Sequence, residues 1–213
     1  MDKSQTPRIY LLPPSDGIVV LGAGGHAKVV ISTIVAAGGA IAGIYDDDEV
    51  KFGWSILGHT VSAWPSECCG DAVIAIGDNA QRERVASLLA YQWRTVVHPS
   101  AHVDPSAILG AGVVIFAGAI IQADVVLGDH VIVNTGATID HDCSVGDFAH
   151  FAPGVHLAGG VQVGRGAFFG IGSVVLPALK IGAWATVGAG AVVLHDLPER
   201  AVAYGVPAKQ KSL

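Results

Sequence analysis

Charged residues, cysteines and long apolar runs are all scarce in this sequence. Of its 213 residues 14% are charged, about half the usual share, and the formal net charge is −6. A negative chain has no general attraction for nucleic acid or anionic lipid, so we expect no nucleic acid and no membrane as a partner. Two charge-free windows, 29–45 and 105–123, approach the length of a membrane span, but glycines interrupt both. The sequence therefore predicts a soluble chain that holds any anionic substrate with local donors.

The three cysteines exclude a disulfide framework and a cysteine-based zinc site. Two of them, Cys68 and Cys69, are adjacent, and Cys143 falls at a core position of the repeat described below. The first eight residues are polar, without the apolar segment of a secretory signal. Both features favour a protein of the reducing cytoplasm.

A six-residue repeat fills the C-terminal half of the chain. From Val97 to Val193 every sixth residue is large and apolar, and four positions after each stands Ala, Val, Cys, Ser or Leu. In a left-handed parallel β-helix each hexad gives one short strand with one inward side chain, and three hexads make one triangular coil. Seventeen consecutive matches predict this fold, with between five and six stacked coils. The repeated positions are Val97, Val103, Leu109, Ile115, Ile121, Leu127, Val133, Ile139, Val145, Phe151, Leu157, Val163, Phe169, Val175, Ile181, Val187 and Val193.

The N-terminal half has another pattern, in which strand-like apolar runs alternate with helix-like runs. This alternation predicts a small Rossmann-like parallel α/β domain, residues 1–96, before a β-helix domain, residues 97–213. We expect strands at 17–21, 40–45 and 71–76, and helices at 26–37 and 80–91, the second with Arg and Glu on its polar face. After residue 196 the repeat is broken at Pro198 and Pro207, so this segment is expected to cap the open end, a short terminal helix being one form it can take.

Three loops of the predicted sheet meet beyond the carboxyl ends of its strands, where such sheets bind ligands. The loop Gly22–Gly25 opens a helix, whose N–H groups and dipole suit a phosphate. Asp46–Asp48 can accept hydrogen bonds from a ribose or a base, and Gly77–Asn79 follows the next strand. Glycine-rich turns also serve packing, this one lacks the third glycine of the dinucleotide fingerprint, and an acidic turn can simply be solvated. The candidate substrate-binding residues of these loops are Gly24, Gly25, His26, Asp46, Asp47 and Asn79.

An outward histidine stands beside carboxylates in the β-helix. His141 comes two residues after the inward Ile139, with Asp140 before it and Asp142 after it. Carboxylates can orient an imidazole and raise its basicity, as a general base requires, although a surface histidine in a polar turn fits the same residues. His150 lies half a coil further on, so it could meet His141 only through a neighbouring subunit, which implies a symmetric oligomer.

The nine histidines show no spacing that suits a three-histidine zinc site. We therefore expect no metal. Cys143, at an inward position, is expected in the core and not as a nucleophile.

Several motifs together resemble one enzyme family, the hexapeptide-repeat nucleotide-sugar N-acetyltransferases, and in particular its members that act on perosamine. The likeness spans almost the whole chain. The motifs are Gly22-Ala-Gly-Gly-His-Ala-Lys-Val-Val, Tyr45-Asp-Asp-Asp, Ile76-Gly-Asp-Asn, the stretch Asn134 to Asp142, Phe169-Gly-Ile-Gly-Ser-Val-Val-Leu-Pro and Gly205-Val-Pro-Ala-Lys.

This resemblance implies an acetyl-CoA-dependent enzyme that works as a homotrimer in O-antigen or other surface polysaccharide biosynthesis. His141 then corresponds to the general base, Asp142 to an acidic neighbour that relatives often have as Glu, and His150 to a second active-site histidine. The nucleotide sugar, GDP-perosamine by resemblance, is expected on the N-terminal domain and near Asn134. Acetyl-CoA is expected between adjacent β-helices, near Gly159, Ile171 and Ala189.

Three other functions stay open on the sequence alone. The acceptor sugar can be UDP-linked, because base discrimination depends on loop contacts that the motifs do not fix. A sugar hydroxyl can replace the amine, because it also needs a base. A β-helix can also be a scaffold module, although the outward positions here are irregular and lack the regular ladder expected of such a surface.

Overall fold

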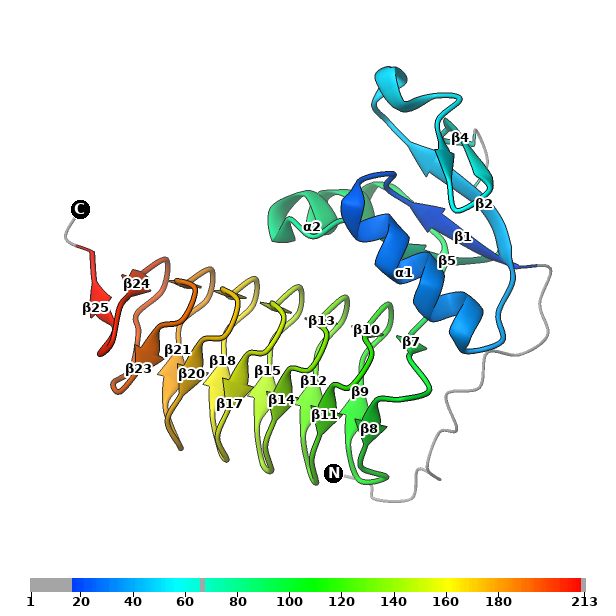
Figure 1. The fold of residues 1–213 in the computed structure, drawn as a ribbon. Coiled ribbons are helices and arrows are strands. Elements are labelled where there is room, and N and C mark those ends of the chain that lie inside the picture. The colour runs from blue at the N-terminus through cyan, green and yellow to red at the C-terminus, as the bar shows by residue number, and fades with distance from the viewer. Residues whose placement is uncertain (1–16, 66–67, 212–213) are drawn as a thin grey trace.

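The computed structural model describes residues 17–65 and 68–211. Figure 1 shows an α/β domain beside a long ladder of short strands. The predicted fold, a parallel α/β domain followed by a left-handed parallel β-helix, is confirmed. The division between residues 96 and 97 stays a prediction; the first strand of the ladder, β7, spans Val96–Val97. Among the residues of these two ranges, no helix is long and apolar enough to cross a membrane.

Six strands form the sheet of the α/β domain, in the order β3-β4-β2-β1-β5-β6. Strand β1 pairs in parallel with β2 and β5, while β3 and β4 make an antiparallel hairpin. The predicted strands and helices are present with ends shifted by a few residues, whereas the hairpin and β6 were not predicted. The elements are β1 (Ile18–Leu21), α1 (Gly25–Ala36), β2 (Ile41–Asp46), the 3-10 turn η1 (Glu49–Lys51), β3 (Ser55–Ile56), β4 (His59–Ala63), β5 (Asp71–Ile74), α2 (Asn79–Leu88) and β6 (Gln92–Trp93).

The β-helix is built from strands of two residues, and the second residue of each is the apolar residue that the repeat predicts. Residues 18 apart pair in parallel, as Ile115 does with Val133. Their inward side chains form one continuous core. The strands are β7, β8 (His102–Val103), β9 (Ile108–Leu109), β10 (Val114–Ile115), β11 (Ile120–Ile121), β12 (Val126–Leu127), β13 (Ile132–Val133), β14 (Thr138–Ile139), β15 (Ser144–Val145), β16 (His150–Phe151), β17 (His156–Leu157), β18 (Gln162–Val163), β19 (Phe168–Phe169), β20 (Val174–Val175), β21 (Lys180–Ile181), β22 (Thr186–Val187) and β23 (Val192–Val193).

The three faces of the prism have different surroundings. Every third strand belongs to the same sheet. We call the sheet that contains β7, β10, β13, β16, β19 and β22 the covered sheet. The second sheet contains β8, β11, β14, β17, β20 and β23, and the third sheet contains β9, β12, β15, β18 and β21. Val114 and Ile132 point outward from the covered sheet and share a hydrophobic core with Val30 and Ile34 of α1. Burial of these apolar side chains fixes the α/β domain over one face of the β-helix.

The C-terminal segment covers the end of the covered sheet, as predicted, but it does so with strands. Strand β24 (Val202–Tyr204) pairs in parallel with β22, and β25 (Lys209–Gln210) pairs with β24 in the antiparallel sense. The short terminal helix, which the sequence left open as one form of this cap, is therefore not formed by residues 196–211. An edge strand exposes unpaired backbone donors and acceptors, and a further strand satisfies them more directly than a helix does.

Candidate active site

His141 occupies the corner between the second and third sheets, directly after β14. Its side chain is 61% exposed, and its Nδ1 lies 2.7 Å from Oδ2 of Asp142. Asp142 has a φ of 60°, the left-handed conformation that the corner imposes and that aspartate tolerates better than most residues. The backbone N–H of His141 donates to Oδ1 of Asp140 at 2.8 Å. The predicted outward His141–Asp142 pair is thus formed.

The two aspartates change the acid–base properties of His141. The hydrogen bond with Asp142 raises the pKa of His141 above its usual 6.5, and the negative charge of Asp140 adds to this. Because a carboxylate accepts the hydrogen on Nδ1, the lone pair is left on Nε2. An exposed neutral imidazole in this tautomer is equipped to take a proton from a bound substrate.

Gly159 lies against the His141 ring on the next coil. A Cβ at Gly159 would stand 2.6 Å from Nε2 and Cε1 of His141, so any side chain there would displace the imidazole. The N–H of Gly160 donates to the carbonyl of His141 at 2.9 Å and fixes the stacking of the two corners. Gly159 is therefore required by close approach, beside the nitrogen that carries the free lone pair.

Asp46 holds the glycine-rich loop in place. Its Oδ2 accepts from the N–H of Ala23 at 2.6 Å, and its Oδ1 accepts from the N–H of Asp48 at 2.9 Å and from Nζ of Lys51 at 3.0 Å. Burial would raise the pKa of Asp46, but the hydrogen bonds from Asp48, Lys51 and Ala23 outweigh it and lower the pKa. Both carboxylate oxygens already have partners. The exposed Asp47 instead lies 3.4 Å from Nη1 of Arg84.

The N-terminus of α1 is open. Gly24 caps it without a side-chain hydrogen bond, and its first turn contains no acidic residue. A Cβ at Gly24 or Gly25 would meet nothing within 4 Å, and neither residue has a positive φ. The fold therefore demands glycine at neither position. Bare backbone N–H groups at a helix N-terminus, with the ammonium group of Lys51 nearby on Asp46, suit a phosphate that must approach closely.

A second group of predicted residues lies between the α/β domain and the covered sheet. His150 is 7% exposed, and its Nδ1 lies 2.9 Å from the Gly77 carbonyl oxygen. Its Nε2 lies 3.5 Å from Nδ2 of Asn134, and its ring centroid is 5.9 Å from that of His26. Asn79 donates to the Gly166 carbonyl at 3.0 Å. His26, Asn79, Asn134 and His150 therefore come together, apart from His141.

Both histidines of this group are neutral. Burial, with the charge of Arg82 adding to it, lowers the pKa of His26 to about 4 and that of His150 to about 3. Of His26, His141 and His150, only His141 has a raised pKa, as expected of a general base.

Arg82 connects this group and was misplaced by the sequence pattern, which put it on the polar face of the second helix. It is 1% exposed, and α2 buries Asn79, Arg82 and Val85 as one stripe. That stripe at intervals of three residues was the available signal. It was masked because two of its three members are polar.

The residues expected near acetyl-CoA lie at two edges of the second sheet. Gly159 shares the corner of His141, whereas Ile171 and Ala189 follow β19 and β22 at the corner next to the covered sheet. The N–H of Gly190 donates to the Ile171 carbonyl at 2.8 Å, and Ile171 is 61% exposed. A ligand that touches all three residues must extend across this sheet.

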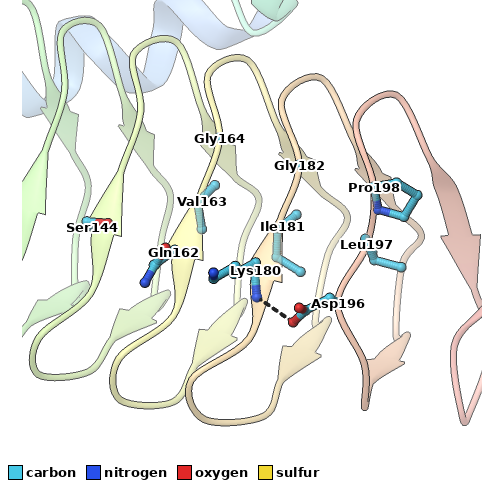
Figure 2. Close-up of a pocket in the computed structure, with 10 residues that line it drawn as sticks. All are labelled: Ser144, Gln162, Val163, Gly164, Lys180, Ile181, Gly182, Asp196, Leu197 and Pro198. Atoms are coloured by element: carbon cyan, nitrogen blue, oxygen red, sulfur yellow. Dashed lines mark hydrogen bonds between the residues drawn. The ribbon is translucent and has the colours of Figure 1, made fainter.

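Two depressions mark the surface. An open groove of about 600 Å³ runs along the third sheet and carries Gln162 and Lys180; Figure 2 shows the contact in which Lys180 N–H donates to Asp196 at 2.8 Å. It contains none of the predicted site residues. A cleft of about 330 Å³ lies between the start of α2 and the covered sheet, and Asn79 lines it with Phe168 and Trp184. Across residues 17–65 and 68–211, no cluster of His, Cys, Asp or Glu suits a metal ion.

Comparison with known proteins places this architecture among enzymes. Residues 17–89 match the family model described as the PglD N-terminal domain. The structure of PerB from Caulobacter crescentus, in complex with CoA and GDP-perosamine, is 42% identical with a TM-score of 0.86, over 92% of this chain and 97% of that chain. A variant of perosamine N-acetyltransferase from the same organism, with the same two ligands, is 41% identical with a TM-score of 0.86 over the same shares. The acetyltransferase domain of PglB from Neisseria gonorrhoeae, in complex with acetyl coenzyme A, is 38% identical with a TM-score of 0.82, over 91% and 98%.

Two curated relatives match over shorter stretches. UDP-N-acetylbacillosamine N-acetyltransferase from Bacillus subtilis is 38% identical over 113 residues, 47% of this chain and 51% of that relative. An uncharacterized protein of Acanthamoeba polyphaga mimivirus is 34% identical over 113 residues. The chain spans about half the length of the first and 22% of the second.

The α/β domain, the hexapeptide coils and the corner histidine define the class of hexapeptide-repeat acyltransferases. Within that class, identity of 41% over nearly the full length of both chains shows that this protein belongs to the family of nucleotide-sugar N-acetyltransferases that includes the perosamine enzyme.

Proposed function

We propose that this protein transfers the acetyl group of acetyl-CoA to the 4-amino group of a nucleotide-linked sugar, with GDP-perosamine as the substrate. The observation that carries the proposal is the exposed His141, oriented by Asp142 at 2.7 Å and backed by a glycine on the next coil. The ligands named with the Caulobacter crescentus enzyme, CoA and GDP-perosamine, support the substrate pair.

His141 acts as the general base. A sugar amine is mostly protonated at neutral pH, so it must lose a proton before its nitrogen can attack the thioester carbonyl. That first proton leaves to water, and Nε2 of His141 takes a second proton from the nitrogen as the new C–N bond forms. The tetrahedral oxyanion is stabilised by a backbone N–H, for which we propose Gly159. When the intermediate collapses the C–S bond breaks, and the CoA thiolate receives the proton from His141.

No covalent acetyl-enzyme takes part in this scheme. Cys143 is 1% exposed, and burial raises the pKa of its thiol. Its Sγ donates to the Ala158 carbonyl at 3.3 Å. A buried, protonated thiol is a core side chain and not a nucleophile.

The nucleotide sugar is held by the α/β domain. We assign the diphosphate to the N–H groups of Gly24, Gly25 and His26 at the start of α1, and the ribose or base to Asp47. Asp46 keeps the loop ordered for this contact. Asn79, Asn134 and His150 then serve the sugar side, at the cleft beside α2.

His141 and the substrate domain of one chain lie on different sides of its prism. The domain covers one sheet, while His141 stands at the corner between the other two. A sugar bound to the domain of one chain is therefore presented to His141 of a neighbour, and a homotrimer closes this arrangement. Acetyl-CoA would lie between adjacent β-helices, along the second sheet from Gly159 to Ile171 and Ala189.

The test is a panel of GDP- and UDP-linked 4-amino sugars, with a hydroxyl sugar of each type, assayed by thiol release from acetyl-CoA and by mass of the product. We expect acetylation of the GDP-linked amine. Preference for the UDP-linked amine would move the proposal to the reaction named for the Bacillus subtilis relative. Transfer to hydroxyl sugars alone would refute N-acetylation.

The matched variant is His141→Asn, which keeps the size and polarity of the side chain. We expect normal assembly and a fall in turnover of about 100-fold or more, the usual contribution of a general base. His98→Asn, at a partly exposed histidine of the first coil, is the control. Unchanged turnover in His141→Asn would remove His141 from the mechanism.

A further inference from the structure

Arg82 is a fully buried guanidinium that is bonded only to neutral acceptors. Its Nε donates to the His130 carbonyl at 2.9 Å, and its Nη2 donates to the Phe148 carbonyl at 2.7 Å and to Oδ1 of Asn79 at 2.9 Å. Its Nη1 donates to the carbonyls of Ile76 at 3.0 Å and Gly77 at 3.2 Å. A buried charge is costly unless its donors are all used, and the planar fork of arginine meets this demand here.

These acceptors belong to two parts of the fold. Ile76 and Gly77 lie in the loop before α2, whereas His130 and Phe148 lie at successive corners of the β-helix. A single rigid group thus sets the position of the Gly77 loop relative to the coils.

The Gly77 carbonyl has a second partner, His150. Its oxygen receives the Arg82 donor at 3.2 Å and lies 2.9 Å from Nδ1 of His150. A carbonyl oxygen can only accept, so the hydrogen of the neutral His150 ring must be on Nδ1. Nε2 is then a bare acceptor, 3.5 Å from Nδ2 of Asn134.

His150 also borders the cleft at the start of α2. Gly77, which it contacts through Nδ1, lines that cleft, and so does Phe168, whose ring centroid lies 5.3 Å from that of His150. A displaced Gly77 carbonyl would release the ring to the other tautomer and turn the acceptor into a donor.

We propose that Arg82 is a positioning residue of the transfer site: by holding the Gly77 carbonyl it keeps His150 in the Nδ1–H tautomer, with Nε2 as an acceptor for an N–H or O–H group of the nucleotide amino sugar. This role rests on the function proposed above. Arg82 differs from a residue with a purely structural role, because its effect on turnover passes through the tautomer of the His150 ring.

The first test uses the unmodified protein. Histidines are labelled with ¹⁵N, and long-range ¹H–¹⁵N correlations report which ring nitrogen carries hydrogen; the His150 signals are those lost in His150→Gln. We expect Nδ1 protonated and Nε2 unprotonated at pH 7.5. A His150 ring with hydrogen on Nε2 would overturn the proposal, whatever the variants do.

The second test is a double-mutant cycle with Arg82→Lys and His150→Gln. Lysine keeps the charge but cannot hold the Gly77 and Phe148 carbonyls together. In the native background we expect Arg82→Lys to lower kcat about 10-fold, because misplacement of a site group by about 1 Å is costly. In the His150→Gln background the same substitution should change kcat by no more than about 3-fold. Equal losses in both backgrounds would show that Arg82 acts elsewhere.

Arg165→Met is the matched control. Arg165 also joins α2 to the β-helix, through Glu83 and Asp147, but it is 43% exposed and contacts neither Gly77 nor His150. We expect its kcat to stay near the native value. A loss equal to that of Arg82→Lys would point to general docking of α2 and contradict the positioning role.

The two proposals fail separately. If the native protein acetylates no sugar of the panel, the proposed function fails, and the nitrogen correlations still show whether His150 has the assigned tautomer. If the native protein is active and the cycle is additive, this inference fails and the proposed function stands. If Arg82→Lys does not assemble, the tautomer in the native protein decides.

Discussion

At the scale of single residues, the His141–Asp142 pair sets how activity should depend on pH. His141 must be neutral to accept a proton, so kcat/KM should fall as the pH drops through its pKa, which Asp142 raises above 6.5. In Asp142→Asn the anionic acceptor is gone, and the pKa returns toward 6.5. The acid limb of the kcat/KM profile should therefore move to lower pH, while the plateau falls about 10-fold with the weaker base.

Asp140→Asn separates charge from orientation. Asp140 accepts a hydrogen bond from the backbone N–H of His141 and contributes a smaller part of the increase in the pKa of His141. In Asp140→Asn the acid limb of the kcat/KM profile should therefore shift less than in Asp142→Asn, and the plateau should stay near the native value. An acid limb that stays in place in Asp142→Asn would mean that another group controls the profile.

The orientation of a single side chain was predictable where the six-residue repeat determines whether that position faces inward or outward. The register fixed His141 as outward and Cys143 as inward, and both positions are confirmed. Arg82 was not predictable in this way, because its burial depends on carbonyls of β-helix corners about 50 and 66 residues later in the chain. Local periodicity contains no information on such partners.

At the scale of elements, the hexads were the most readable part of the sequence, because each strand must place one apolar side chain inward regardless of context. The β3–β4 hairpin was missed, since two-residue and five-residue strands at a sheet edge leave little periodic signal. The C-terminal cap was predicted at the correct place, but it consists of strands instead of a helix, because a strand can pair with the free edge of the covered sheet.

The glycine-rich loop depends on an element-level contact that Asp46→Ala would remove. Without Asp46, Ala23 N–H and Lys51 lose their shared acceptor, and the loop that we assign to the diphosphate loses its order. We expect the KM for the nucleotide sugar to rise about 10-fold and the KM for acetyl-CoA to stay within about 2-fold, because we place the two ligands on different domains.

Asp104→Ala, on the first coil and far from the loop, serves as the comparison for both KM values. Equal increases of the two KM values in Asp46→Ala would place Asp46 outside the substrate side. Circular dichroism of each variant checks that the α/β domain is still folded.

At the scale of the whole molecule, three buried neutral histidines connect the two domains. Burial lowers the pKa of His26 and His130 to about 4 and that of His150 to about 3, against an unfolded value of 6.5. The unfolded chain therefore binds more protons at intermediate pH. Stability should be complete above about pH 6.5 and fall from there to about pH 4, by up to roughly 1.4 kcal/mol per pH unit for each histidine.

Urea unfolding at pH 7.5, 6.5 and 5.5 measures this loss. His26→Asn should flatten the dependence between pH 6.5 and 5.5, whereas the exposed His195→Asn should leave it unchanged. If the midpoint stays constant over this range in the native protein, the three rings do not control acid stability.

The arrangement of domain and corner predicts that catalysis needs two chains. The α/β domain lies on the covered sheet and His141 at the opposite corner, so each site should combine the domain of one chain with His141 of its neighbour. His141→Asn and Gly25→Glu each remove one half; the second adds a side chain where there is free space and a negative charge where we place the diphosphate. Each variant alone should be inactive.

Coexpression of the two variants with different affinity tags should restore activity. In a mixed trimer one of the three sites combines an intact domain with an intact neighbouring His141, so we expect about a third of the native turnover in the doubly purified fraction. Sites confined to one chain would give none, because every chain lacks one half. Size measurement by light scattering on the same fraction tests the trimer, and a monomer at assay concentration would contradict the shared site.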